Sequence, residues 1–82
     1  MHQNLDIVFQ DGSTRTVKAI AADFVAFESK FDLSIARLEK EIRLTHLLFL
    51  AWHCEQRTKA TALDFDAWIE TVESVGLADT KK

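Results

Sequence analysis

Residues 32–59 read DLSIARLEKEIRLTHLLFLAWHCEQRTK, a stretch that contains neither glycine nor proline. Its apolar residues recur at steps of three and four, which is the repeat of one face of an α-helix. A second apolar row begins at Leu44, and residues 47–52 are apolar on every side. The sequence therefore predicts one dominant helix, about 40 Å long by the rise of an α-helix. The apolar residues of the first row are Ile35, Leu38, Ile42, Phe49 and Trp52.

A β-hairpin is predicted ahead of this helix, at residues 4–20. Leu5, Ile7 and Phe9 alternate with mostly polar neighbours, as in a half-buried strand. Asp11-Gly12 is a strong turn signal, and residues 13–20 are rich in β-branched side chains. Because an isolated hairpin is marginal in water, its apolar face should pack on the long helix. Alternatively, the hairpins of two subunits join through their exposed edges.

A short helix is expected between the hairpin and the long helix, at residues 21–31. Phe24, Phe27 and Phe31 share one face of it, and Asp23 lies near its start as a cap or a first-turn anion. We interpret the three phenylalanines as core residues. Asp32 is predicted either to cap the long helix that follows or to lie in a brief break before Leu33.

A final helix is predicted after residues 57–60, where the long helix should end. Thr61 to Asp64 fit a capping box, and Gly76 is placed to terminate the helix in the left-handed conformation. Residues 77–82 are expected to form a mobile tail. The inner face of this helix would carry Phe65, Trp68, Ile69, Val72 and Val75.

The predicted fold is therefore a single α+β domain over residues 1–82, mainly helical. It comprises an N-terminal hairpin (residues 4–20) and three helices (residues 21–76), of which the middle one is long. Cys54 is the only cysteine, so no disulfide can form within the chain, and an unpaired thiol suits a reducing compartment. The N-terminus lacks the pattern of a secretory signal, and residues 44–52 are too few to span a bilayer.

The net charge of −3 argues against nucleic-acid binding, which depends on clusters of Lys and Arg. His46, His53 and Cys54 are the only cluster of soft metal ligands. On one helix the two histidines would lie about 10 Å apart along the axis, too far for one zinc ion. Cys54 would point away from His53, so a Cys–His catalytic pair is not expected either. We predict neither an enzyme, nor a metal site, nor a cofactor site.

The surplus apolar surface of the long helix is the main functional signal. Either the other elements cover all of it and the domain is monomeric, or part of it binds a partner or a second copy of the chain. We favour the second alternative. The candidate contact residues are Leu47, Leu48, Leu50, Ala51 and Trp52, followed by Phe65 and Trp68.

The order of motifs resembles that of the tail assembly chaperones of long-tailed, non-contractile bacteriophages. A hairpin with DG at its turn precedes D-x-x-x-F-E, at residues 23–28. The long helix ends in L-x-F-L-A-W-x-x-x-x-R, at residues 47–57, and T-x-L-D-F-x-x-W follows at residues 61–68. The most specific pieces are the LAW…R segment and the F-x-x-W pair.

The resemblance implies a non-enzymatic chaperone in the cytoplasm of the host cell that is absent from the mature virion. Members of that family bind the hydrophobic, helical tape measure protein, keep it soluble and recruit tail tube subunits around it. The chain would correspond to their short, non-frameshifted form and would form a homo-oligomer. The alternative function is a small dimeric regulatory or antitoxin-like module that binds another protein or, less readily, DNA.

Overall fold

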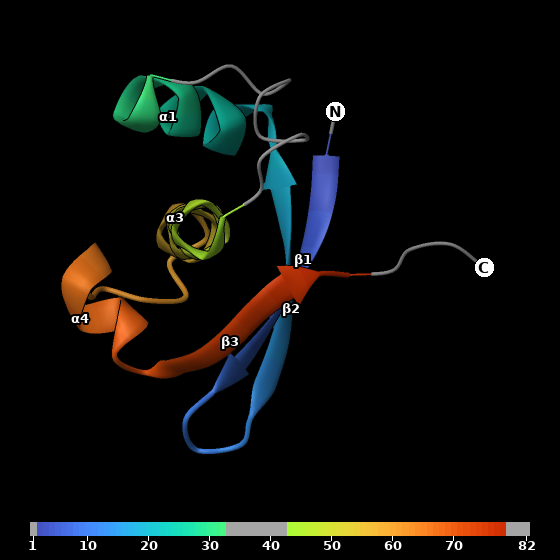
Figure 1. Ribbon diagram of the computed structural model, residues 1–82, viewed down its shortest axis with the longest axis vertical. Helices are drawn as coiled ribbons and strands as arrows, with labels where there is room; N and C mark the ends of the chain where they lie inside the picture. Colours follow the sequence, from blue (N-terminus) through green and yellow to red (C-terminus); the bar gives the residue numbers. More distant parts are fainter. Residues whose placement is uncertain (1, 33–42, 79–82) are drawn as a thin grey trace.

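The computed structural model describes residues 2–32 and 43–78, which form a three-stranded sheet with a layer of helices on one side (Figure 1). The elements in chain order are β1 (His2–Phe9), β2 (Thr14–Ile20), α1 (Ala21–Phe31), α3 (Leu44–Arg57), α4 (Phe65–Ile69) and β3 (Val72–Leu77). The class is therefore α+β. The mainly helical arrangement, a hairpin followed by three helices with a long middle one, is wrong.

Strands β1 and β2 form the expected hairpin, in which Leu5 lies opposite Val17. Gly12 at the turn has φ 93°, a conformation that residues with a Cβ atom rarely adopt. The Asp11 carboxylate accepts hydrogen bonds from the backbone N–H and the hydroxyl of Ser13, at 2.8 and 2.7 Å. This local network fixes the turn that the sequence predicts.

The main correction to the predicted fold is β3, which pairs antiparallel with β1 where the sequence predicts the end of a helix. Val75 lies opposite Ile7, whereas Val72 lies opposite Phe9, so β3 carries one residue more than β1 over this span. Such a β-bulge lets two residues three apart both face the core. Val72 and Val75 therefore mimic the helical repeat while they are buried in a strand.

Two details of the C-terminal region follow from the presence of β3. Gly76 pairs with Asp6 inside the strand and does not terminate a helix. Leu77 ends β3, and the N–H of Ala78 donates to the carbonyl of Asn4 at 2.9 Å, so the predicted mobile tail does not begin at residue 77. Residues 79–82 of that predicted tail lie outside the described residues.

The predicted continuous helix over residues 32–59 is also wrong. Asp32 adopts the left-handed conformation and ends α1, and its N–H donates to the carbonyl of Glu28. Arg43 is extended, with φ −116° and ψ 154°, and this conformation interrupts any helix that would run through it. Helix α3 thus begins at Leu44. The first part of the predicted helix, with Ile35, Leu38 and Ile42, lies outside the described residues.

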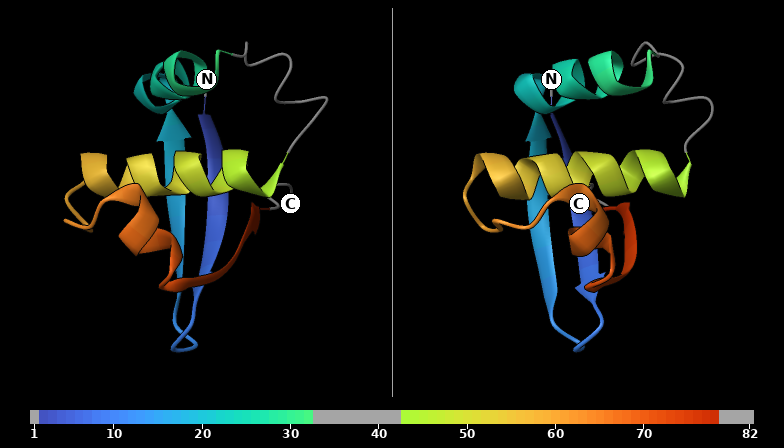
Figure 2. Two further views of the ribbon diagram at one scale, coloured as in Figure 1. Left: turned by 60° about the vertical axis from the view of Figure 1, so that its left-hand side comes forward. Right: turned by 90° about the vertical axis from the view of Figure 1, so that its left-hand side faces the viewer.

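Helix α3 lies across the strands, between α1 and α4, and the core fills the space between this helical layer and the sheet (Figure 2). Phe24 and Phe27 of α1 are buried, as their spacing predicts, and Phe31 packs against the core from its margin. Asp64, and not Thr61, caps α4, because its carboxylate accepts from the N–H of Ala67 at 2.8 Å. Among the described residues, no helix is long and apolar enough to cross a membrane.

Candidate functional site

Two buried carboxylates organise the face that α3 turns toward α1 and β2. The first is Asp23 in the first turn of α1, whose side chain is fully buried. Its Oδ2 accepts from the N–H of Ile20 at 2.8 Å, which ties the start of α1 to the end of β2. Arg57 donates to both oxygens of Asp23, from Nε at 3.1 Å and from Nη2 at 3.0 Å. A bidentate pair of this kind fixes the relative position of the two helices.

His53 and Cys54 complete the environment of Asp23. His53 Nδ1 lies 2.6 Å from Oδ1 of Asp23, and Cys54 Sγ donates to its Oδ2 at 3.3 Å. Burial raises the pKa of Asp23, but the hydrogen bonds from Arg57, Ile20, His53 and Cys54 outweigh it, so that the pKa lies below its usual value. Asp23 is therefore ionised and surrounded by hydrogen-bond donors, which does not suit the role of a general base.

The Cys54 thiol is not activated by this environment. Burial, the negative charge of Asp23 and the hydrogen bond to its carboxylate raise the pKa of Cys54 to about 12. Nucleophilic cysteines need the opposite shift, because the thiolate is the reactive form. The arrangement brings Asp, His and Cys together, but it holds the thiol protonated at neutral pH.

The second carboxylate, Glu55, is also fully buried on α3. It forms an ion pair with Arg15 of β2, and Trp68 Nε1 of α4 donates to its Oε1 at 3.1 Å. The guanidinium of Arg15 lies over the ring of Phe9, 5.0 Å from its centroid. Glu55 thus connects α3 to β2 and α4, as Asp23 connects α3 to α1 and β2.

Neither carboxylate cluster is predicted by the sequence pattern. Their helical spacing excludes direct contact of His53 and Cys54 with each other or with one metal ion, but it does not address contact with a side chain of another helix. Both side chains instead meet an acceptor from another helix, and Arg57 joins them because it lies four and three residues further along α3. An acidic residue among the phenylalanines of α1 was the available signal. Within the described part of the chain, no group of three or more His, Cys, Asp and Glu side chains could hold a metal ion.

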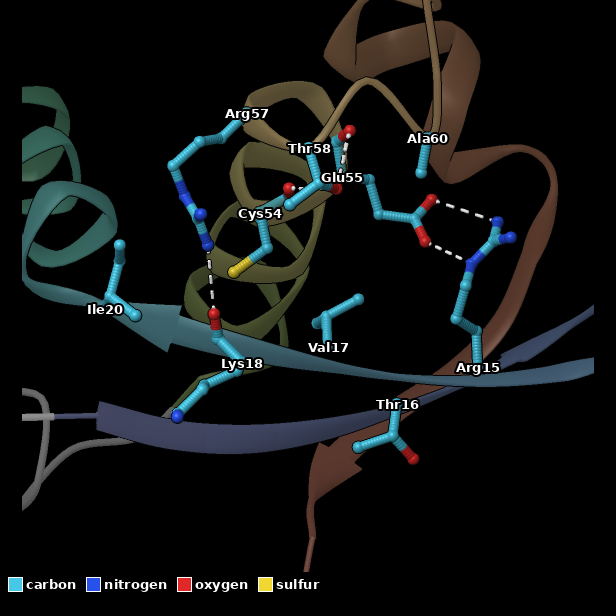
Figure 3. A pocket seen from close by; sticks show the side chains of 10 residues that line it. All are labelled: Arg15, Thr16, Val17, Lys18, Ile20, Cys54, Glu55, Arg57, Thr58 and Ala60. Atoms are coloured by element: carbon cyan, nitrogen blue, oxygen red, sulfur yellow. Dashed lines mark hydrogen bonds and ion pairs between the residues drawn. The ribbon is translucent and has the colours of Figure 1, made fainter.

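A groove of about 320 Å³ lies between β2, which is an edge strand of the sheet that the described residues form, and the C-terminal turn of α3 (Figure 3). Arg15 and Arg57 flank it, and Val17, Cys54 and Ala60 supply apolar lining. The Nη2 of Arg57 donates to the carbonyl of Lys18 at 3.0 Å, across the groove. The groove therefore combines exposed backbone of an edge strand with two guanidinium groups.

A partly exposed apolar surface runs along α3 toward α4, and we call it the aromatic stripe. Leu44, Leu48 and Trp52 lie on successive turns of α3, and Trp52 contacts Phe65 with 5.6 Å between ring centroids. Leu44 is 60% exposed and Leu63 is 42% exposed, whereas the other members are partly buried. The aromatic stripe comprises Leu44, Leu48, Trp52, Leu63 and Phe65.

The predicted contact residues divide between core and surface. Leu50, Ala51 and Trp68 are buried, so they support the fold and present little area to a partner. Leu47 packs at the margin of the core. Leu48, Trp52 and Phe65 belong to the aromatic stripe and remain candidates for contact. Sequence reasoning missed Leu63 as a member, because its place beside Trp52 depends on how the loop before α4 folds back.

Comparisons with known proteins identify no relative: no family model, no curated protein and no solved structure matches the chain.

Proposed function

We propose that the chain is a non-enzymatic chaperone that shields an apolar helix of another protein on its aromatic stripe. The observation that carries this proposal is the contiguous, partly exposed apolar surface formed by α3 and α4. Surfaces of this kind on a small domain mark sites of protein interaction. A surface of leucine and aromatic side chains suits the apolar face of an amphipathic helix.

The nature of the buried polar groups agrees with a binding role. Asp23 and Glu55 are each paired with an arginine, and the Cys54 thiol is held protonated. Catalysis would need such groups at an accessible site with a pKa close to the working pH. These side chains instead join α1, α3, α4 and β2 into one unit that presents the stripe.

The specific proposal is a phage tail assembly chaperone in its short form. It would bind the helical tape measure protein, help recruit tail tube subunits, self-associate and act in the host cytoplasm. The residues that carry the resemblance support this proposal because several contact each other: Asp23 pairs with Arg57, and Trp52 contacts Phe65. Motif residues that contact each other depend on one arrangement of the chain, whereas motif residues that lie far apart would not.

The test is co-expression with the tape measure protein encoded beside the gene for this chain. The chain should keep that protein in the soluble fraction, and the double variant Leu44→Glu, Leu63→Glu should abolish the effect because it places two charges on exposed positions of the stripe. Val25→Glu is the matched control, since Val25 is 63% exposed on α1, outside the stripe. Equal solubilisation by the double variant would overturn the proposal, as would the absence of a long helical reading frame beside the gene.

A further inference from the structure

The aromatic stripe is bordered by acidic residues on the side of α4. Residues 60–78 contain neither lysine nor arginine, whereas the whole chain has 10 lysine and arginine residues. The acidic residues of this stretch are Asp64, Asp66, Glu70 and Glu73, and all four are exposed. Arg43 precedes α3 and Lys59 follows it, so both lie outside the stretch. The α4 side of the stripe is thus acidic without interruption.

Three of these carboxylates lie on or next to α4. Asp64 stands between Leu63 and Phe65 in the chain, and Asp66 follows Phe65 in the first turn of α4. Successive Cα atoms are about 3.8 Å apart, so Asp64 and Asp66 lie at the border of the stripe. Glu70 comes four residues after Asp66, on the same side of α4, and α4 lies against α3 (Figure 2). We call Asp64, Asp66 and Glu70 the acidic flank.

The carboxylates of the acidic flank are not neutralised within the described part of the chain. No ion pair there involves any of the three. The one hydrogen bond that their carboxylates accept there comes from the N–H of Ala67 to Asp64, which caps α4. Asp23 and Glu55, in contrast, are buried, and each is paired with an arginine. The acidic flank therefore presents a negative potential beside the stripe.

We propose that the helix bound on the aromatic stripe is basic, with lysine or arginine side chains placed against the acidic flank. This inference rests on the proposed function, because it names the chemistry of the partner that docks there. The apolar face of the helix contacts the stripe and supplies affinity, while complementary charge selects the partner and its register. Lysine and arginine suit this border, because their stems cover apolar surface while their charges stay in water.

A second copy of the chain is a poorer occupant of the stripe. If the stripes of two copies met, each copy would bring the three carboxylates of its acidic flank to the contact. The exposed cations that flank α3 are only two in each copy, Arg43 and Lys59, in the described part of the chain. Like charges brought together at an interface are unfavourable, and each chain has a net charge of −3. A separate basic helix is the better electrostatic match.

The test uses two fluorescein-labelled helical peptides that share one leucine-rich apolar face. The polar positions carry lysine in one peptide and glutamate in the other. Anisotropy should show tighter binding of the lysine peptide, and added salt should reduce this preference, because it screens exposed charges. The triple variant Asp64→Asn, Asp66→Asn, Glu70→Gln should weaken binding of the lysine peptide about fivefold through the loss of three exposed charge pairs. Asparagine at position 64 keeps the helix cap.

The matched control for charge is Asp6→Asn. Asp6 is exposed and alternates with the buried Leu5 and Ile7, so it lies on the face of the sheet away from the helices. This variant should bind the lysine peptide as the wild type does. Equal affinity of the wild type for the two peptides overturns the proposal, as does unchanged binding of the lysine peptide by the triple variant.

The double variant Leu44→Ser, Leu63→Ser separates this inference from the chaperone proposal, because it alters the stripe without changing its charge. It should weaken binding of the lysine peptide. If both peptides bind the wild type equally and the double variant weakens both, the stripe remains a contact surface and only the basic partner is overturned. If the double variant binds the lysine peptide as tightly as the wild type, the contact lies outside the stripe and the inference fails.

Two further outcomes overturn the inference. The first is that neither peptide binds, in which case co-expression still decides the chaperone proposal by itself. The second is that sedimentation shows a dimer of the chain that the double variant dissociates, while the lysine peptide does not bind. A second copy of the chain would then be the occupant of the stripe.

Discussion

Helix α3 carries two surfaces that differ in charge and in exposure to solvent. One holds His53, Cys54, Glu55 and Arg57 against α1 and β2, where the Asp23 and Glu55 carboxylates are fully buried. The other carries the aromatic stripe, which is apolar and partly open to solvent. The difference shows that the chemically richer surface does the structural work. The chemically plain surface is the one that we propose contacts another molecule.

The largest expected effect is on the carboxylate side. Arg57→Ala should lower the free energy of unfolding by about 3 kcal/mol, because it leaves the buried Asp23 carboxylate without its guanidinium. Domains of this size are stable by only about 5–10 kcal/mol, so the loss should be plain in urea denaturation. The control is Arg43→Ala, since Arg43 is exposed just before α3. Similar losses from both variants would contradict the stabilising role of the Asp23–Arg57 pair.

The pH dependence of stability gives an intermediate test of the same contrast. Because the pKa of Asp23 is lower in the folded chain than its value of about 3.9 in the unfolded chain, its contribution to stability is present above about pH 4. The contribution is lost as the pH falls through the folded pKa. The difference in free energy of unfolding between wild type and Asp23→Asn should therefore be largest near neutral pH and shrink below pH ~4. A constant difference down to pH ~2 would contradict the role given to the ionised carboxylate.

The smallest effect is expected on the aromatic stripe. Leu44→Glu should change the free energy of unfolding by less than about 0.5 kcal/mol, because Leu44 is 60% exposed and its removal opens no cavity. Thermal unfolding followed by circular dichroism is sufficient to measure this. A loss as large as that of Arg57→Ala would show that the stripe belongs to the core, and would remove the basis for a contact surface there.

Local sequence signals predicted the elements whose structure is locally determined. The hairpin follows from the alternation of Leu5, Ile7 and Phe9 and from the turn at Asp11-Gly12, and α3 ends where the periodic pattern ends. The sequence did not predict β3, because the bulge opposite Phe9 gives Val72 and Val75 the spacing of a helix. Only pairing with a strand more than 60 residues away in the sequence distinguishes the two interpretations.

Like the fold, the candidate site was predicted only in part from the sequence. The apolar character of residues 47–52 pointed to α3, and Leu48 and Trp52 are on its stripe. The position of α4 and the burial of Asp23 and Glu55 decide which of these residues belong to the core. Contacts between distant segments of the chain set the position and the burial. Single-sequence patterns carry no information on such contacts.

The loop before α4 has one further consequence for how the stripe would bind. The carbonyl oxygen of Leu63 accepts from Trp52 Nε1 at 2.9 Å and from Gln56 Nε2 at 3.1 Å. This hydrogen bond restrains the Trp52 side chain, and Phe65 packs against it. Ordering a flexible side chain on association costs about 0.5–1.5 kcal/mol, and here much of that cost is already met in the free chain. The stripe is thus preorganised, and a helix that docked there, as we propose, would meet side chains that are already ordered.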